Sequence, residues 1–433
     1  MALSFFHCCA SIAPQQHQAK LNLRGNKALE DVKSLIKTVG VPSVVSSPVK
    51  SLQNGNWVKL ICGASFEVIA YIRNLSLVYT LAGVDCIDCA ADVSVVSAVN
   101  EGIDAALEIF PFQRPWVMIS VNDDEDLHFR KAEFDPEECP LDCSRPCERV
   151  CPADAISFES AWSTTKFSYG NKTPTSVKAG VLTERCYGCG RCIPVCPYDK
   201  ISVSTYIRDT TATSELLKRN DVDAIEIHTS GRYSTLIIKS VLSLSFCRQI
   251  APFKELWDGL GGSIKHLKLA AVSLPDHGES TVSTMKAMYS IMKPDLSCFN
   301  LWQLDGRPMS GDIGRGATRE SIAFALRLAA IKERPHGFLQ LAGGTNAHTV
   351  DGLRKVGLFQ ATSFTKNSRD ENSTAMIGGV AYGGYARKIV GRILSSMQSQ
   401  HGITVIEDYP EHLLQALREA LGLVGKLKCY QSF

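Results

Sequence analysis

The most constraining feature of this sequence is a pair of cysteine-rich runs between residues 139 and 197. The second run reads CYGCGRCIPVCP and has the spacing C-x2-C-x2-C-x3-C-P, which is typical of a bacterial [4Fe–4S] cluster loop. The first run reads CPLDCSRPCERVCP and has the looser spacing C-x3-C-x3-C-x3-C-P. Eight of the sixteen cysteines lie in these two runs. The spacing therefore predicts that the chain binds iron–sulfur clusters.

The two runs are halves of an internal duplication. Each continues as C-P-x-D-x-I-S followed by an apolar residue, and strand-like segments, FRKAEFD and SVKAGVL, precede them. In two-cluster ferredoxins the fourth cysteine of one run ligates the cluster of the other run. We therefore expect two [4Fe–4S] clusters with crossed ligands. The expected ligand sets are Cys186, Cys189, Cys192 and Cys151 for one cluster, and Cys139, Cys143, Cys147 and Cys196 for the other.

Three alternatives to this arrangement stay open at the level of sequence. Zinc sites usually show two separated C-x2-C pairs, a layout that the runs do not require. Disulfides would need an oxidising compartment. Because the spacing of the first run departs from the pattern, a single cluster beside a degenerate half is the third alternative. Gly188 and Gly190 favour a cluster, since they let the backbone wrap closely around inorganic sulfur.

Outside the cysteine runs, short apolar segments alternate with stretches of helical length, which is typical of parallel β/α units. Eight such segments predict a (β/α)8 barrel-like α/β domain, with an open doubly wound sheet as the alternative. The cysteine block interrupts the third unit and reads as an inserted ferredoxin-like α+β domain. The strand candidates are KLICGAS, GVDCIDCAA, PWVMISV, DVDAIEIHTSG, HLKLAAVSLPD, LSCFNLWQLDGRP, GFLQLAGGTN and GVAYGGYAR. The expected helices are 66–81, 93–109, 233–246, 318–331 and 384–397.

The resulting division has four parts: a leader and linker at 1–50, barrel at 51–122 and 206–433, and the two-cluster insert at 123–205. The leader has no acidic residue before Glu30 and carries basic ones, as organelle transit peptides do. It predicts import into the chloroplast stroma. The net charge of +2 implies neither nucleic acid nor an anionic membrane as partner, and no apolar run reaches membrane-spanning length.

Paired glycines end the seventh and eighth predicted strands. Barrel proteins often bind phosphate at this position, where helix N-termini offer backbone N–H groups. Gly343, Gly344, Gly383 and Gly384, with Arg387 one helical turn further, are therefore candidate ligands for an anion such as the phosphate of FMN. The alternative is that these glycines only permit tight turns. Single polar residues at other strand ends, such as His228 and Asp305, are weak signals. The remaining cysteines are expected to be ordinary buried side chains: Cys62, Cys86, Cys89, Cys247, Cys298 and Cys429.

Four segments together resemble the LdpA (light-dependent period) family: NGNWVKLICGASF, HFRKAEFDPEECPLDCSRPCERVCP, RCYGCGRCIPVCP and LQLAGGTN. The resemblance covers most of the chain after about residue 50. It implies an iron–sulfur protein, with the family cysteines falling on the two runs. Cyanobacterial members of this family carry light or redox state to the circadian clock and associate with an input histidine kinase. The resemblance implies no catalytic residues, and the basic leader suggests a plastid-targeted relative.

Two classes of function follow. In the first, the chain is a redox sensor or electron-transfer adaptor that signals to a protein partner. Arginines beside the cysteines, namely Arg145, Arg149, Arg185 and Arg191, would respond to the added negative charge of a reduced cluster. In the second, the chain is an oxidoreductase that passes electrons to a flavin or small organic substrate in the barrel mouth.

Overall fold

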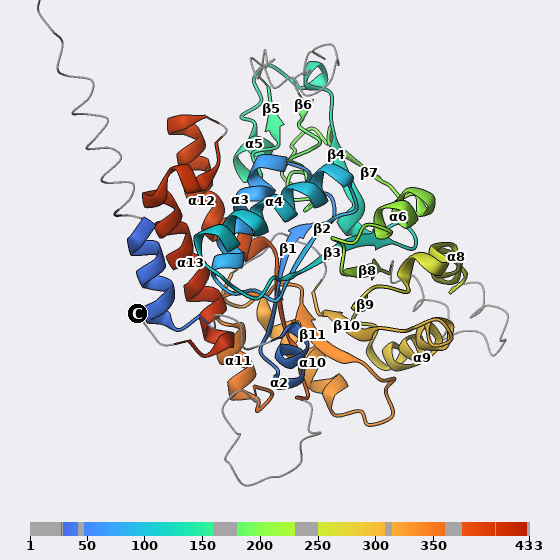
Figure 1. Cartoon of the computed structure of the whole chain (residues 1–433). Coiled ribbons are helices and arrows are strands. Elements are labelled where there is room, and N and C mark those ends of the chain that lie inside the picture. Colours follow the sequence, from blue (N-terminus) through green and yellow to red (C-terminus); the bar gives the residue numbers. More distant parts are fainter. Residues whose placement is uncertain are drawn as a thin grey trace, which may run out of the picture.

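The computed structural model describes residues 27, 29–41, 47–158, 180–229, 250–307, 314–359, 375–402 and 404–430. Eight parallel strands close into a barrel in the order β1-β12-β11-β10-β9-β8-β3-β2, with helices packed around it (Figure 1). Because β1 pairs with both β2 and β12, the predicted barrel is confirmed and the open sheet is excluded. The strands are β1 (Trp57–Gly63), β2 (Cys86–Ala90), β3 (Trp116–Asn122), β8 (Ala224–His228), β9 (Leu269–Pro275), β10 (Phe299–Asp305), β11 (Phe338–Ala342) and β12 (Gly379–Tyr382).

All eight strand candidates form barrel strands, and four of the five expected helices are present. The fifth, 233–246, lies outside the described residues. The main helices are α2 (Pro48–Asn54), α3 (Ile69–Leu81), α4 (Val93–Ile109), α6 (Thr210–Leu217), α8 (Ala251–Leu260), α9 (Thr281–Met292), α10 (Thr318–Ala329), α11 (Thr349–Lys355), α12 (Gly384–His401) and α13 (Pro410–Lys428). Short 3-10 turns lie at Leu127–Phe129 (η1), Pro136–Glu138 (η2), Gly261–Ile264 (η4), Gly278–Ser280 (η5) and Ile406–Asp408 (η6).

The barrel strands are buried on both faces, which explains why they read as nearly continuous apolar runs. Their outward side chains pack against the helices in one large core. Inward side chains at the amino-terminal end form a second core, which includes Trp57, Met118 and Leu301 and is covered by Leu52 of α2. Cys86 lies in this inner core and Cys89 in the outer one, as expected for strand residues three apart. This end of the barrel is therefore a packed scaffold.

The cysteine block is inserted between β3 and β8 and has its own small core. Strand β4 (Arg130–Glu133) pairs antiparallel with β7 (Ser202–Thr205), and β5 (Ile156–Ser157) pairs with β6 (Gly180–Val181). Thus the strand that leads into each cysteine run pairs with the strand that follows the other run. The helix α5 (Pro146–Val150) lies in the first run. This pairing is what a duplicated ferredoxin-like unit requires.

Asn122, the last residue of β3, ties both ends of the insert to the barrel. Its Nδ2 donates to the carbonyl oxygens of Asp124 and Tyr206, each at 2.8 Å, and its Oδ1 accepts from the backbone N–H of Arg208 at 3.1 Å. These contacts lie close to the expected boundaries at 122/123 and 205/206. The boundaries themselves stay a prediction.

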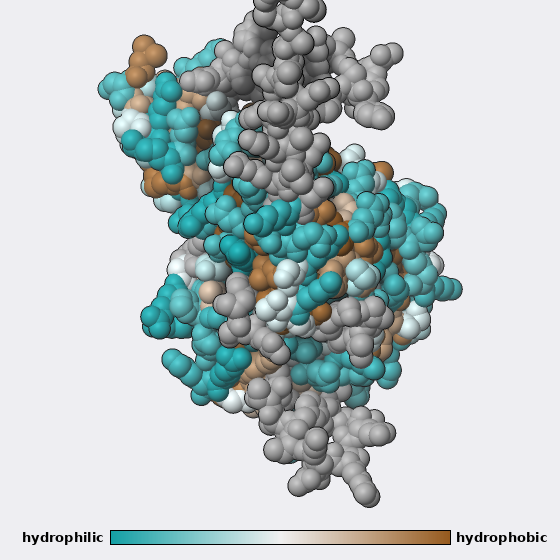
Figure 2. Space-filling view, turned by 60° about the vertical axis from the view of Figure 1, so that its left-hand side comes forward, coloured by the Kyte–Doolittle hydropathy of each residue, from teal (hydrophilic) through white to brown (hydrophobic). Residues whose placement is uncertain are grey.

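Part of the expected leader and linker is packed against the barrel. Residues 29–39 are helical, and Val32, Ile36 and Val39 are buried in the large core. The basic segment that predicts a transit peptide lies almost entirely outside the described residues. Within the described part of the chain, no helix is both long and apolar enough to cross a membrane. The face of the molecule seen in Figure 2 is largely hydrophilic where it is coloured, with apolar patches between the hydrophilic residues.

Candidate iron–sulfur centre and barrel mouth

The fold brings the eight cysteines of the two runs together as two groups of four. We call Cys139, Cys143, Cys147 and Cys196 the first thiol set, and Cys151, Cys186, Cys189 and Cys192 the second thiol set. Burial raises the pKa of Cys139, and so do a hydrogen bond with Cys143 and the other thiols of the first set. Burial and the other thiols of the second set raise the pKa of Cys192 to about 11. These neighbour relations agree with the crossed ligand sets, whose assignment to clusters stays a prediction.

The proximity of the thiols within each set indicates a site for a cation. Four thiolates held together destabilise one another unless a metal compensates their charge. All eight thiols are free, so the described cysteines of the two runs form no disulfide. Free thiols are what ligation of an iron–sulfur cluster requires.

Backbone N–H groups are aimed at the sulfurs in a duplicated pattern. The N–H of Ala155 donates to Cys151 Sγ at 3.2 Å, and that of Lys200 donates to Cys196 Sγ at 3.3 Å. In both loops the aspartate of the repeat, Asp154 or Asp199, has a positive φ near 50°. Hydrogen bonds to cysteine sulfur are a main means by which proteins tune iron–sulfur clusters. The repeated C-P-x-D-x-I-S pattern thus encodes this turn.

The glycines of the second run adopt a backbone conformation that few other residues can take. Gly188 and Gly190 have φ values of 70° and 74°, in the left-handed region that side chains rarely adopt. A Cβ at Gly188 would lie 2.5 Å from the carbonyl oxygen of Arg130, and one at Gly190 would lie 2.4 Å from its guanidinium. Arg130 in turn donates from Nε to the Gly188 carbonyl. Both positions therefore admit only glycine without rearrangement of β4.

Arg387 connects the barrel to the second thiol set. Its Nη1 donates to the carbonyl oxygens of Ile61 and Cys62, at 2.9 and 3.0 Å. Its guanidinium lies 4.6 Å from the ring centroid of Tyr187, next to Cys186 in the chain. This cation–π contact fixes the cysteine loop against the mouth of the barrel. The role of Arg387 as an anion ligand stays a prediction, and its observed role is structural.

A cavity of about 1250 Å³ separates the barrel mouth from the second thiol set. Cys151 and Cys189 line one side, and the glycine pairs Gly343–Gly344 and Gly383–Gly384 line the other. The walls are strongly basic, since eight arginines and lysines face only two aspartates, Asp154 and Asp305. The basic residues are Arg130, Arg149, Arg185, Arg191, Arg307, Arg387, Lys388 and Arg392. A cavity with this charge favours an anionic ligand.

The two glycine pairs differ in conformation. Gly343 and Gly344 have φ values of 70° and 73°, and a Cβ at Gly344 would lie 2.3 Å from the carbonyl oxygen of Ala317. Gly383 and Gly384 begin α12, an 18-residue helix. Tight turns thus explain the first pair, whereas the second pair presents the amino end of a long helix to the cavity. Substitution of Gly344 would distort the turn, so it cannot report on ligand binding alone.

A charged network fills the barrel interior below the mouth. Lys59 of β1 is fully buried, forms an ion pair with Glu226 and lies 3.4 Å from Asp88 Oδ2. Gln303 and Gln340 extend the network to Trp57 through hydrogen bonds. Burial lowers the pKa of Lys59, but the two carboxylates more than compensate, so that its pKa is raised and it stays protonated. The ion pair with Glu226 and the nearby Asp88 are what keep this buried lysine charged.

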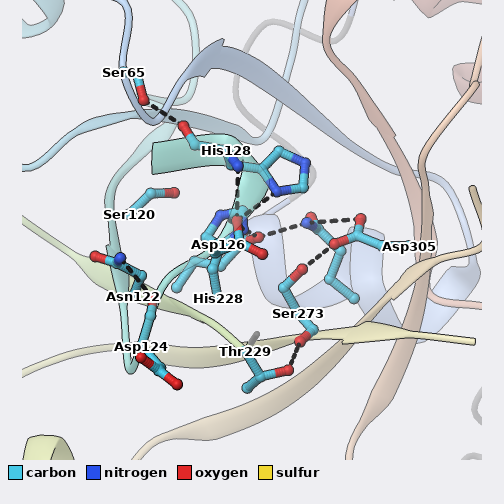
Figure 3. A network of polar contacts seen from close by, with 12 residues as sticks. Ser65, Ser120, Asn122, Asp124, Asp126, His128, His228, Thr229, Ser273 and Asp305 are labelled. Atoms are coloured by element: carbon cyan, nitrogen blue, oxygen red, sulfur yellow. Dashed lines mark hydrogen bonds and ion pairs between the residues drawn. The ribbon is translucent and has the colours of Figure 1, made fainter. Parts of the chain in front are cut away.

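At the mouth, Asp126, His128 and His228 converge (Figure 3). His128 Nδ1 lies 2.8 Å from Asp126 Oδ1, and the two imidazole rings are 4.8 Å apart. Burial lowers the pKa of His128, but Asp126 raises it to about 9. Burial and the neighbouring His128 lower the pKa of His228 to about 3, so its ring is neutral. Asp305 and Ser273, hydrogen-bonded to each other, lie across from them.

Several residues of this region were not anticipated. Asp126 and His128 lie within the predicted insert. The D-x-H pattern just after the third predicted strand is the signal that could have identified them as site residues. The sequence does not identify Lys59 as a buried residue, because a single lysine in an apolar run is also typical of a strand at the edge of a sheet. Asp85 immediately precedes β2, at the amino-terminal end of the barrel, and pairs with Lys428.

The expectation of ordinary buried cysteines is confirmed for Cys62, Cys86 and Cys89, and Cys298 is half-buried. It is wrong for Cys429, which is exposed because it follows the last helix. Cys247 lies outside the described residues.

Comparison with known proteins identifies two family domains in the chain. Residues 139–207 match the LdpA Fe-S cluster-binding domain, and residues 216–426 match the Light dependent period A C-terminal domain. The chain is 39% identical over 385 residues to Light dependent period A of Synechococcus elongatus, covering 88% of this chain and 94% of that protein. A solved structure of tryptophan synthase subunit alpha from Legionella pneumophila is 9% identical and has a TM-score of 0.33, covering 92% of this chain and 98% of that chain. The barrel assignment rests on the strand pairing given above.

Proposed function

Because the chain belongs to the Light dependent period A (LdpA) family, we propose that it is a redox protein with two [4Fe–4S] clusters that communicates their state to a protein partner. The family's Fe-S cluster-binding domain covers both cysteine runs. The observation that carries the proposal is the sorting of eight thiols into two interleaved sets. The clusters supply one-electron oxidation and reduction when bound. The chain's own residues hold them and transmit their charge.

The first thiol set is the side that a partner would contact. Leu141, between Cys139 and Cys143, is fully exposed, and Tyr198, two residues after Cys196, is 42% exposed. Apolar and aromatic side chains of this kind are enriched in protein interfaces. We therefore expect a signalling or redox protein to dock over the first thiol set. Arg145 lies 4.3 Å from the Phe158 ring centroid beside this set, so a change of charge there would act on a contact inside the insert.

Metal analysis tests the cluster proposal directly. Anaerobically purified full chain should contain about eight iron and about eight acid-labile sulfide per polypeptide, as two [4Fe–4S] clusters require. Visible absorption and EPR of the reduced protein should identify the cluster type. Stoichiometric zinc without acid-labile sulfide would contradict the proposal, and about four iron would indicate one cluster beside a degenerate half.

The cavity favours a second candidate function, that of an oxidoreductase. It places the second thiol set opposite the barrel mouth across basic walls, with the amino end of α12 in the lining. FMN is the candidate ligand, because its phosphate would be stabilised by the arginines and by the helix end. In this proposal a cluster held by the second thiol set would exchange electrons with the flavin across the cavity. The anion would lie near Gly383, Gly384 and Arg392.

Flavin binding decides between the two candidates. Wild-type protein should quench FMN fluorescence with a micromolar dissociation constant, and replacing both Arg191 and Arg392 by glutamine should weaken binding about tenfold or more. These two residues line opposite sides of the cavity, one on the insert and one on α12. Arg418→Gln on the exposed face of α13 is the matched control and should bind normally. If wild-type protein neither copurifies with flavin nor binds it at micromolar concentrations, the adaptor function is preferred.

The basic leader motivates a further part of the proposal, which is location in the chloroplast stroma. The segment before residue 27 would be removed on import.

A further inference from the structure

We propose that Asp126, His128 and His228 form a binding site for one divalent transition metal ion in the wall of the barrel-mouth cavity. In the described part of the chain they are the one group of three or more such side chains whose ligand atoms lie within 4.8 Å of one another. Asp126 precedes η1, His128 lies in it, and His228 ends β8. The site uses no cysteine and does not depend on the proposed clusters.

The donor set defines the class of metal. Two imidazoles and one carboxylate on one side of an ion leave further coordination positions open, as in the sites that bind divalent iron and related ions. Both histidines line the cavity, so the open positions would face its interior. Asp305 lines the cavity as well and lies across from the site (Figure 3). The metal would therefore be accessible to a small ligand that enters the cavity.

His228 is prepared as a ligand by its neighbour on the same strand. Its Nε2 lies 3.2 Å from Glu226 Oε1, and the proton of the neutral ring is stable on this nitrogen, which faces the carboxyl group. Nδ1 then carries a lone pair directed toward Asp126, whose Oδ1 is 3.9 Å away. Although His228 is only 6% exposed, its Nδ1 has no hydrogen-bond partner. A histidine that binds a metal through one ring nitrogen usually has a carboxylate beside its other ring nitrogen.

Asp126 and His128 meet the remaining requirements. The carboxylate of Asp126 caps η1 by accepting the backbone N–H of His128 at 2.8 Å, so its position is fixed before any metal binds. The carbonyl of His128 accepts a hydrogen bond from Ser65, which anchors η1 to the loop after β1. Because the ligands are held by the backbone, binding would need little reorganisation.

Titration with Mn²⁺ tests this site in the anaerobically purified full chain. Mn²⁺ prefers carboxylate and imidazole to thiolate, so the thiol sets should not take it up. We expect wild-type protein to bind about one Mn²⁺, measured as loss of the free-ion EPR lines. Asp126→Asn should weaken Mn²⁺ binding at least about tenfold. Changing even a residue that only supports a metal ligand lowers metal affinity by about 10- to 100-fold. Asparagine keeps an oxygen for the η1 cap but lacks the charge.

Two further variants make the result specific. His228→Gln should weaken Mn²⁺ binding in the same way, whereas His277→Gln should leave it unchanged. His277 is a matched control, because it also lies at a strand end beside an aspartate, with an unpartnered ring nitrogen. Unchanged cluster absorption and melting temperature would show that each variant is folded. Absence of saturable Mn²⁺ uptake by wild-type protein, or equal uptake by Asp126→Asn, would overturn the site while leaving the sulfide count, and hence the cluster proposal, intact.

Discussion

Replacing Lys59 by methionine is expected to lower the free energy of unfolding by about 3–5 kcal/mol, since it leaves buried carboxylates without their cation. Lys59 is the buried partner of both Asp88 and Glu226, and all three side chains lie inside the barrel. Methionine matches the length of the lysine stem. The ammonium group of Lys59 lies 3.7 Å from Met118 Sδ, so an apolar end at this position should change the packing little. Chemical denaturation of the two proteins at neutral pH measures the difference.

The pH dependence distinguishes lost charge compensation from poor packing. Burial raises the pKa of both Asp88 and Glu226, and the charge of Lys59 offsets part of that rise. Carboxyl groups of the unfolded chain titrate near pH 4, so folding takes up protons above that pH and stability falls as the pH rises. In Lys59→Met, which lacks the compensating cation, stability should fall more steeply with rising pH than in wild type. The difference in the free energy of unfolding between wild type and Lys59→Met should therefore become smaller as the pH is lowered toward 5.

A triple variant provides the control for this experiment. Combining Lys59→Met with Asp88→Asn and Glu226→Gln removes the cation and both carboxylates, and should recover most of the lost stability. A single variant that loses less than about 1 kcal/mol, or a deficit that does not change with pH, would contradict the assignment of Lys59 as the compensating charge.

Replacing Cys151 by serine is expected to abolish the cluster whose other ligands lie in the opposite run. Iron should fall from about eight to about four per chain, because a serine oxygen does not replace a thiolate ligand. Crossed ligation predicts that the EPR spectrum of the remaining cluster matches that of Cys189→Ser. By the same reasoning, Cys196→Ser should match Cys143→Ser.

Ligation within each run predicts the reverse correspondence, in which Cys151→Ser resembles Cys143→Ser. That outcome would show the assignment of the two thiol sets to be wrong. Cys298→Ser is the matched control, since this half-buried cysteine lies outside both runs. It should retain about eight iron and an unchanged spectrum.

The architecture could be predicted from sequence because its signals are local. Parallel strands buried on both faces produce apolar runs of five to seven residues, such as Trp116–Asn122 and Leu269–Pro275. The duplication was equally visible, because each cysteine loop carries its own turn residues, including Asp154 and Asp199. The repeat also predicts crossed ligation, because in two-cluster ferredoxins the last cysteine of each run ligates the cluster of the other run.

The chemistry of the barrel mouth was decided by tertiary structure. Asp126 and His228 are far apart in the chain, and only the pairing of β3 with β8 brings their strand ends together. Arg387 reaches Tyr187 because barrel closure places α12 beside the insert. Lys59 finds Glu226 across the barrel interior, where the shared inward face depends on closure and register. Sequence thus determined the strands, the repeat and the iron–sulfur-binding character of the cysteine runs, whose signals lie within a few residues of one another. The cavity, its basic walls and the histidine–aspartate site depend on distances across the closed barrel, which no local pattern contains.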